Sequence, residues 1–370
     1  MEKCGNKDRK ITDKIRENLR KIPEYVPGKS INEVKKKYGL RRVIKLASNE
    51  NPYGANPKVL EVLRNFDRFH VYPSPNEIEE LIERISEYLN VEKERIVIGA
   101  GIDGILENIF KMFIDPGDEV VISIPSFPYY HTLTSIFNAR EIRIRRRSNF
   151  KVDEEAVVNS VTDKTKIIIV CSPNNPTGNL EDPEAVKSIV ESCDALVFID
   201  EAYVEFASRS LIDLTEYENV VVARTFSKAF GLANLRIGYA VMSPELKKAY
   251  MKVTTPFPVS SIAVLAATVS LENLDYMKSC VEKIKRERKR LYNELKSRVK
   301  VYPSEANFLF FESPIRSSEL AEELMKRGVI VRDCSRFIGC SPFSVRVSVG
   351  KKEENDEFLR ALDDVLKNIS

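Results

Sequence analysis

Residues 195–203 read ALVFIDEAY, and this stretch decides the fold. Its apolar residues follow one another without a polar interruption up to Asp200, which is typical of a strand buried on both faces of a parallel sheet. Similar runs read KIIIVCSP, VVVARTFS and RIGYAVM, at residues 166–173, 220–227 and 236–242. Segments with helical periodicity alternate with such runs from about residue 40 onward, so the sequence predicts an α/β fold with a mainly parallel sheet.

The chain upstream of this stretch shows the same alternation. A helix is predicted over 76–89, where apolar residues recur at helical spacing. Downstream of it, RIVIG (95–99) and EVVISIP (119–125) flank a second helical segment at 102–113. The turn sequence DPGD separates that helix from the second run, so these residues form one strand–helix–strand unit.

The stretch TTPFPVSS, at residues 254–261, punctuates the chain with prolines and serines. We place the main domain boundary there, near Pro256 to Ser260. The expected organisation is an N-terminal segment (1–40) that packs with the small domain or a partner subunit, a large domain (41–256) and a small C-terminal α+β domain (257–370).

Composition excludes several classes of protein. The 58 basic and 55 acidic residues nearly cancel, so the surface carries no overall field that would attract nucleic acid. The six cysteines and two histidines show no metal-ligand spacing, and we expect reduced thiols and no metal site. A charged N-terminus and the absence of a run of about 18 apolar residues predict a cytoplasmic protein that is not bound to a membrane.

The first candidate site surrounds Lys228, in RTFSKAFGLANLRIG. A lysine after a buried strand and a hydroxyl-rich turn can be an ordinary surface residue. Its neighbours favour a function, because the hydroxyls of Thr225 and Ser227 and the guanidinium of Arg236 suit a phosphate monoester. A cofactor held by its phosphate would bring an aldehyde within reach of the Lys228 amine.

Two further candidate sites follow the neighbouring apolar runs. Asp200 and Tyr203 leave the strand 195–199, and a carboxylate there is either a solvated turn residue or the partner of a protonated pyridine nitrogen. The segment SPNNPTG, residues 172–178, lies at the carboxyl end of a buried strand, where open α/β sheets place ligands. By composition alone it is only a rigid turn.

The three motifs CSPNNPTGN, FIDEAYVEF and RTFSKAFGLANLRIG, in this order and spacing, resemble the active-site signature of the class I and II aminotransferases. The resemblance covers roughly residues 25–350. It implies the aspartate-aminotransferase-like fold, in which a large domain with a mainly parallel seven-stranded sheet and flanking helices joins a smaller α+β domain. It also implies the cofactor pyridoxal 5'-phosphate.

The resemblance assigns roles to the cofactor-binding residues. Lys228 matches the lysine that binds the cofactor covalently and moves the proton, and Asp200 matches the partner of the pyridine nitrogen. Asn175 and Tyr203 match the residues that hydrogen-bond the phenolic oxygen, and Phe127 matches the aromatic that stacks on the ring. The phosphate-binding positions are Thr225, Ser227, Arg236 and the backbone N–H groups of Gly101 and Ile102.

Three of the matched positions need comment. Ile102 stands where relatives often have Ser, Thr or Asp, so only its backbone can donate. Phe127 keeps a stacking face but lacks the hydroxyl of the tyrosine found in many relatives. Tyr72 matches a tyrosine that reaches the cofactor phosphate of the neighbouring subunit, which implies a homodimer with shared active sites.

Within this superfamily the chain is most similar to the histidinol-phosphate aminotransferase family. The similarity rests on YVPGK (25–29), LASNENPYG (46–54), VYPSP (71–75) and VIVRD (329–333). It implies that Arg346 grips the substrate carboxylate, that Tyr25 and Arg332 bind the substrate phosphate, and that Asn175 also lines the substrate site.

The implied reaction belongs to histidine biosynthesis. L-histidinol phosphate and 2-oxoglutarate would give imidazole acetol phosphate and L-glutamate. A threonine-phosphate decarboxylase and an aromatic or aspartate-type aminotransferase are alternatives that share the core motifs. A noncatalytic, cofactor-binding regulatory protein is a more distant alternative, because every catalytic position is filled.

Overall fold

The computed structural model describes residues 10–22, 24 and 28–368. Its largest sheet has the strand order β2-β8-β7-β6-β5-β3-β4. All neighbouring strands are parallel except for β8, which runs antiparallel to β2 and β7. The strands are β2 (Ile96–Gly99), β3 (Glu119–Ile124), β4 (Arg140–Arg145), β5 (Thr165–Cys171), β6 (Leu196–Asp200), β7 (Val220–Thr225) and β8 (Gly238–Val241). The predicted α/β fold with a mainly parallel sheet is confirmed.

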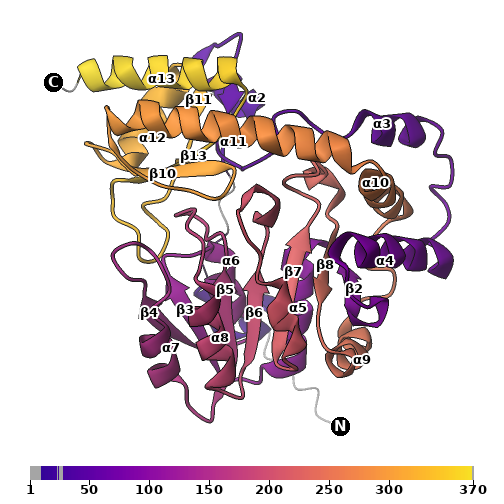
Figure 1. Cartoon of the computed structure of the whole chain (residues 1–370). Coiled ribbons are helices and arrows are strands. Elements are labelled where there is room, and N and C mark those ends of the chain that lie inside the picture. The colour runs from indigo at the N-terminus through magenta and orange to yellow at the C-terminus, as the bar shows by residue number, and fades with distance from the viewer. Residues whose placement is uncertain (1–9, 23, 25–27, 369–370) are drawn as a thin grey trace.

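Helices cover both faces of this sheet (Figure 1), and the middle of each central strand is accordingly apolar on both faces. In β6, Leu196 and Phe198 pack into the same hydrophobic cluster as α5, whereas Val197 and Ile199 pack with α8. The helices of the large domain are α3 (Pro57–Arg64), α4 (Pro75–Leu89), α5 (Gly101–Phe113), α6 (Pro128–Ile136), α7 (Glu154–Ser160), α8 (Pro183–Glu191) and α9 (Pro244–Val253).

The small domain is built on a four-stranded antiparallel sheet with the order β12-β13-β10-β9. Its strands are β9 (Lys300–Tyr302), β10 (Phe308–Glu312), β12 (Arg332–Asp333) and β13 (Ser344–Ser348). The long helix α11 (Leu274–Lys296) runs across the top of the molecule in Figure 1 and packs on this sheet, together with α12 (Ser317–Lys326) and α13 (Lys352–Lys367). The smaller α+β unit is thus present as predicted.

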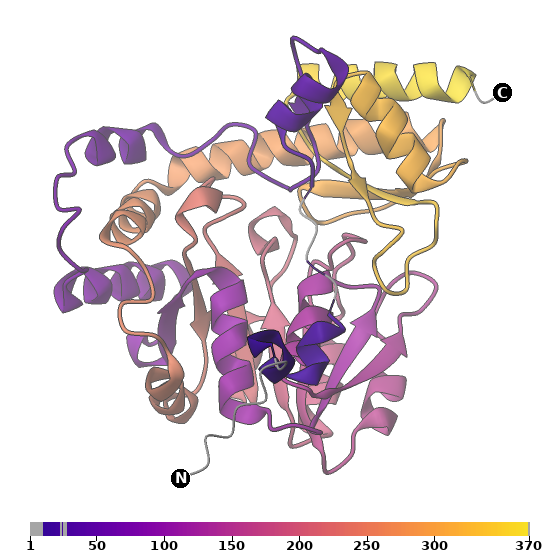
Figure 2. The same ribbon diagram turned by 180° about the vertical axis from the view of Figure 1, so that it is seen from behind.

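The described part of the first 40 residues contacts both domains. Helix α2 (Ile31–Tyr38) packs on α12, and the short strand β1 (Ile44–Lys45) that follows pairs with β11 (Val329–Ile330) of the small domain. In contrast, α1 (Glu17–Arg20) contacts α6 of the large domain, on the side of the molecule seen in Figure 2. There Asn18 Nδ2 donates to the carbonyl of Ser135 at 2.7 Å.

Helix α10 (Ser261–Glu272) falls within the range that the sequence assigned to the small domain. It contacts α3 and α4, and its alanines share a hydrophobic cluster with β2 and β8 of the large sheet. This packing favours a boundary at the α10–α11 junction near Asn273, because a buried apolar helix belongs with the core that covers it.

Two glycines mark where the domains touch. Gly178 has a φ of 79°, and a Cβ on it would lie 2.3 Å from Ser304 Oγ of the small domain. Gly339 has a φ of 90°, and a Cβ there would lie 2.9 Å from the nitrogen of Pro125 in the large domain. Any side chain at either position would push the two domains apart.

Within residues 10–22, 24 and 28–368, no helix is long and apolar enough to cross a bilayer, and no cluster of His, Cys, Asp or Glu is placed to hold a metal ion. The cysteines of the described part are free thiols. The cytoplasmic location stays a prediction.

Candidate active site

A cavity of about 220 Å³ lies at the carboxyl ends of β5, β6 and β7, between the two domains. It brings together residues that are far apart in the sequence. Among the predicted site residues, its lining includes Ile102, Phe127, Asn175, Asp200, Tyr203, Thr225, Ser227, Lys228, Arg236, Arg332 and Arg346.

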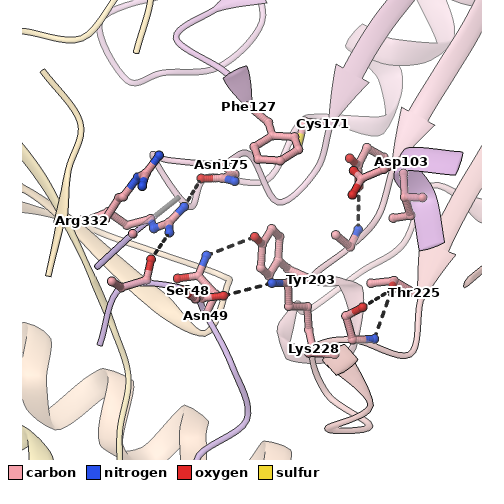
Figure 3. A pocket seen from close by; sticks show the side chains of 18 of the residues that line it. Ser48, Asn49, Asp103, Phe127, Cys171, Asn175, Tyr203, Thr225, Lys228 and Arg332 are labelled. Atoms are coloured by element: carbon pink, nitrogen blue, oxygen red, sulfur yellow. Dashed lines mark hydrogen bonds between the residues drawn. The ribbon is translucent and has the colours of Figure 1, made fainter. Parts of the chain in front are cut away.

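Lys228 follows β7 and is the central residue of this cavity. Its Nζ donates to the carbonyl of Ser48 at 3.1 Å and lies 5.7 Å from the centre of the Tyr203 ring (Figure 3). Burial lowers the pKa of the Lys228 amine to about 8, and the positive charge of Arg346 adds to this effect. At pH 7 about a tenth of the molecules therefore carry the uncharged, nucleophilic amine, far more than for a lysine with the ordinary pKa of 10.5.

Asp200 ends β6 and is buried. Its carboxylate accepts hydrogen bonds from the Tyr130 hydroxyl at 2.5 Å and from the backbone N–H of Ala202 at 2.9 Å. Burial raises the pKa of Asp200 to about 6, although both hydrogen bonds oppose this shift. A carboxylate in this setting gains much from a cationic partner, and a protonated ring nitrogen would be one.

Tyr203 lies beside Lys228 and is held from the other side by Asn49, whose Nδ2 donates to the Tyr203 hydroxyl at 3.1 Å (Figure 3). Burial raises the pKa of Tyr203 well above its usual value. The hydroxyl is thus neutral at physiological pH and can donate to an anionic oxygen.

Hydroxyl and guanidinium groups converge at one end of the cavity. Thr225 Oγ1 and Ser227 Oγ are 2.9 Å apart, and Arg236 Nη1 donates to Ser227 Oγ at 3.4 Å. Gly101, the first residue of α5, packs closely against this arginine: a Cβ on Gly101 would lie 3.1 Å from Arg236 Nη2. Two hydroxyls, a guanidinium and the N-terminus of a 13-residue helix are donors of the kind that suit a phosphate group.

Asp103, in the first turn of α5, was not predicted. It lines the cavity, and its Oδ2 accepts from Arg236 Nη2 at 3.0 Å. Burial raises the pKa of its carboxyl group. The available signal was its position just after the glycine that opens α5, where a carboxylate complements the helix dipole.

Arg346 and Arg332 lie on the opposite side of the cavity. They are register partners on β13 and β12, so both guanidinium groups project from the same face of the small sheet. Arg346 donates from Nη1 to Asn175 Oδ1 at 2.6 Å and from Nη2 to the carbonyl of Ala47 at 2.7 Å. In Figure 3, Arg332 and Asn175 face Asp103 and Thr225 across the pocket.

Two predicted residues lie outside the cavity lining, and a third is not among the described residues. Gly101 does not line the cavity itself but packs behind Arg236. Tyr72 is 71% exposed and stacks on Phe257, with ring centres 4.2 Å apart, outside the cavity of its own subunit. Tyr25 lies outside the described residues.

Asn49, Tyr130 and Phe337 also line the cavity and were not predicted. Asn49 and Tyr130 hold Tyr203 and Asp200 by the hydrogen bonds given above. Phe337 supports Arg332, whose Cζ lies 5.4 Å from the centre of the aromatic ring.

The residues present fit pyridoxal 5'-phosphate. The phosphate site, the buried carboxylate of Asp200 and the amine of Lys228 line one cavity, and the face of Phe127 lies in the same lining. A flat cationic ring with a phosphate arm and an aldehyde would satisfy all four groups.

Comparison with known proteins agrees with this geometry. The family model described as Aminotransferase class I and II matches residues 41–362. Histidinol-phosphate aminotransferase 1 of Archaeoglobus fulgidus is 55% identical over 324 residues, which cover 88% of this chain and 99% of that protein. Histidinol-phosphate aminotransferase of Methanocaldococcus jannaschii is 43% identical over 370 residues, covering 96% of this chain and 98% of that protein.

Solved structures give the same result. The histidinol-phosphate aminotransferase of Sinorhizobium meliloti, in complex with pyridoxal-5'-phosphate, matches with a TM-score of 0.87 at 27% identity, over 96% of this chain and 98% of that one. Aspartate aminotransferase of Thermus thermophilus with maleate shares the fold, with a TM-score of 0.81 at 22% identity, over 95% of this chain and 99% of that one.

Proposed function

This chain belongs to the class I and II aminotransferases, and we propose that it transfers the amino group of L-histidinol phosphate to 2-oxoglutarate. The products are imidazole acetol phosphate and L-glutamate, a step of histidine biosynthesis. The observation that carries the substrate assignment is the pair Arg332 and Arg346, which the small sheet presents side by side to one cavity. A substrate phosphate and a carboxylate that use the same pocket in turn both need such donors.

Pyridoxal 5'-phosphate supplies an electron sink for the substrate Cα carbanion. We assign the protein's contribution as follows. Thr225, Ser227 and Arg236 bind the cofactor phosphate, and Asp200 holds a proton on the ring nitrogen by its negative charge. Lys228 would hold the cofactor through its amine and, once freed by the substrate, would take the proton from the substrate Cα and return it to the neighbouring carbon of the cofactor.

The remaining residues orient the reacting groups. Tyr203 and Asn175 donate to the phenolic oxygen of the cofactor, and Phe127 covers one face of its ring. Arg346, which Asn175 and Ala47 hold in place, binds the α-carboxylate of glutamate and of 2-oxoglutarate. Arg332 and the predicted Tyr25 bind the phosphate of histidinol phosphate.

We also propose that the enzyme is a homodimer with shared active sites. Phe69, Val71, Tyr72 and Phe257 are exposed apolar side chains around a second cavity of about 510 Å³. Arg236 lines both this cavity and the active site, so the exposed apolar surface adjoins the phosphate site. Exposed apolar side chains grouped in this way are typical of a subunit interface.

A mixing experiment tests the sharing of residues. Subunits carrying Tyr72→Ala and subunits carrying Lys228→Ala are unfolded together and refolded to form hybrid dimers. If Tyr72 acts on the partner's site, each hybrid contains one intact site, and activity above that of either variant returns. If mixing restores no activity although hybrids form, Tyr72 does not act across the interface.

The substrate assignment is tested by single-turnover absorbance on the holoenzyme, with L-histidinol phosphate, L-glutamate and threonine phosphate added separately. We expect the first two to convert the lysine-bound cofactor into its amine form. If separate additions of L-phenylalanine or L-aspartate converted the cofactor and histidinol phosphate did not, the protein would be a different aminotransferase. Release of carbon dioxide from threonine phosphate would make it a decarboxylase.

A further inference from the structure

A buried ion pair lies behind the cavity, between the segments that carry Phe127 and Asn175. Arg146, just beyond β4, pairs with Glu181, and both side chains are 1% exposed. Neither residue lines the cavity, and neither was predicted from the sequence. Removing two charges from water costs free energy, so a buried ion pair with several further hydrogen bonds calls for an explanation.

The guanidinium of Arg146 reaches three segments at once. Its Nε donates to the carbonyl of Pro125 at 3.0 Å, and its Nη2 donates to Asn174 Oδ1 at 3.0 Å. Its Nη1 donates to Glu181 and, at 3.0 Å, to the carbonyl of Phe150. A planar fork with five donors can make these contacts together, whereas an ammonium group cannot.

Glu181 completes the arrangement from the other side. Its Oε2 accepts from the backbone N–H of Val152 at 2.8 Å, and its Oε1 accepts from Asn179 Nδ2 at 3.2 Å. The backbone N–H of Glu181 donates to Ser172 Oγ at 3.1 Å. The first and last residues of the segment 172–181 are thus hydrogen-bonded to each other, and the ion pair also holds Asn174 between them.

Each of the three segments leads to the active site. Pro125 lies two residues before Phe127, and Asn174 precedes Asn175, whose Oδ1 accepts the hydrogen bond from Arg346. The ring of Phe150 packs edge-on against Tyr302 and Phe310 of the small domain, with ring centres 4.9 and 5.6 Å away. That domain carries Arg332 and Arg346.

We propose that Arg146 and Glu181 are positioning residues, which set Asn175 against Arg346 for carboxylate binding and lock the Phe150 turn onto the small domain. The inference rests on the proposed function, because it concerns the site that binds the amino and keto acids. Apolar side chains of similar volume could fill the same space, so the charges contribute geometry more than stability. Their loss therefore affects substrate binding before it affects the fold.

The test compares Arg146→Lys with Asn355→Ala, on holoenzyme. Asn355 is a matched control: it is fully buried, donates to Gly350 O at 2.9 Å and to Glu287 Oε2 at 3.0 Å, and does not line the cavity. We expect Arg146→Lys to raise KM for glutamate, and the inhibition constant of succinate, about tenfold, while kcat falls less than about threefold. Both variants should lower Tm by similar amounts, because each loses buried hydrogen bonds. Asn355→Ala should nevertheless leave KM for glutamate and the inhibition constant of succinate unchanged.

A second variant covers the case in which Arg146→Lys does not fold. Asn174→Ala keeps the ion pair and removes its link to Asn175, and the same rise in KM is expected. Unchanged KM and succinate inhibition in a folded variant would overturn the proposal, as would an equal rise in Asn355→Ala. Succinate binding is measured from the absorbance of the bound cofactor without turnover, so failure of the histidinol-phosphate assignment would not be mistaken for failure of the ion pair.

Discussion

The active-site cavity has two walls of different origin. One wall, the cofactor wall, carries Asn175, Asp200 and Lys228, each at or shortly after the end of a neighbouring parallel strand of the large sheet. The other, the substrate wall, combines Arg332 and Arg346 of the small sheet with the segment 47–49. The three residues of the cofactor wall belong to one domain, whereas the substrate wall depends on how two domains meet. Chemistry should therefore be separable from substrate choice by mutation.

The largest effect is expected from Lys228→Ala, on the cofactor wall. Loss of the amine removes the covalent attachment and the proton carrier together, so turnover should fall on the order of 10⁴-fold or more. The loss should be equal for histidinol phosphate and glutamate, because both use the same lysine. Steady-state rates with each donor measure it, and Lys278→Ala, an exposed lysine on α11, is the control.

Noncovalent cofactor binding should survive in Lys228→Ala, because the phosphate site is intact. A donor-dependent loss would break the separation of the two walls. Near-normal transamination would remove Lys228 from its assigned role.

Arg332→Ala tests the substrate wall. Removing a charge-assisted donor should lower kcat/KM for histidinol phosphate about 10- to 100-fold and affect glutamate much less. Arg336→Ala is the matched control, because this arginine lies on the same segment, is exposed and does not line the cavity. Equal losses for both donors would mean that Arg332 does not recognise the substrate phosphate.

The pH dependence of cofactor binding to the apoenzyme tests whether a residue of the substrate wall changes the pKa of Lys228 on the cofactor wall. The pKa of Lys228 is lowered to about 8, so the association rate should rise about tenfold per pH unit below pH 8 and level off above it. Arg346, from the substrate wall, contributes to that shift by its positive charge. Arg346→Gln should therefore move the midpoint to higher pH, and stopped-flow absorbance measures it. An unmoved midpoint would mean that Arg346 does not lower the pKa of Lys228.

The two walls also differ in how well the sequence predicts them. The cofactor wall was predicted almost completely, because each of its residues follows a buried strand within a short motif, and strand ends of a parallel sheet meet at one edge. The same regularity predicted the sheet itself. Asp103 and Tyr130 were missed, since they reach this wall from helices whose sequences show only amphipathic periodicity.

The contacts of the substrate wall join segments that no local pattern connects. Asn49 and Tyr203 are 154 positions apart, and Arg346 meets Ala47 across 299 positions. Arg332 and Arg346 were found by resemblance, whereas Phe337, which supports Arg332, carries no signal in its neighbours. Arg146 was equally hidden, because it lies in the run RIRRR (143–147) between arginines that are exposed. The placement of α10 could not be predicted, because an apolar helix at a domain boundary can join either core.

The smallest effect on catalysis is expected from Glu205→Gln, behind the cofactor wall. Glu205 lies two residues beyond Tyr203. Its buried carboxylate oxygens have no hydrogen-bond partner among the described residues. The neighbouring Arg224 pairs with Glu201 instead, at 2.8 Å. Burial raises the pKa of Glu205 from 4.5 to about 7. The folded state thus holds this proton more tightly than the unfolded state does, and stability is lost as pH rises from about 4.5 through 7.

Glu205→Gln removes that loss. The variant should be more stable than the parent by about 1–3 kcal/mol at pH 8, and the difference should shrink as pH falls toward 4.5. Chemical denaturation at the two pH values measures it, with Glu201→Gln as a control that should destabilise, since it leaves Arg224 with a weakened partner. KM for both donors should stay unchanged, because Glu205 touches neither wall of the cavity. If the variant is no more stable than the parent at pH 8, the folded protein already stabilises the charged carboxylate of Glu205. A changed KM would mean that a substitution behind the cofactor wall alters the substrate site.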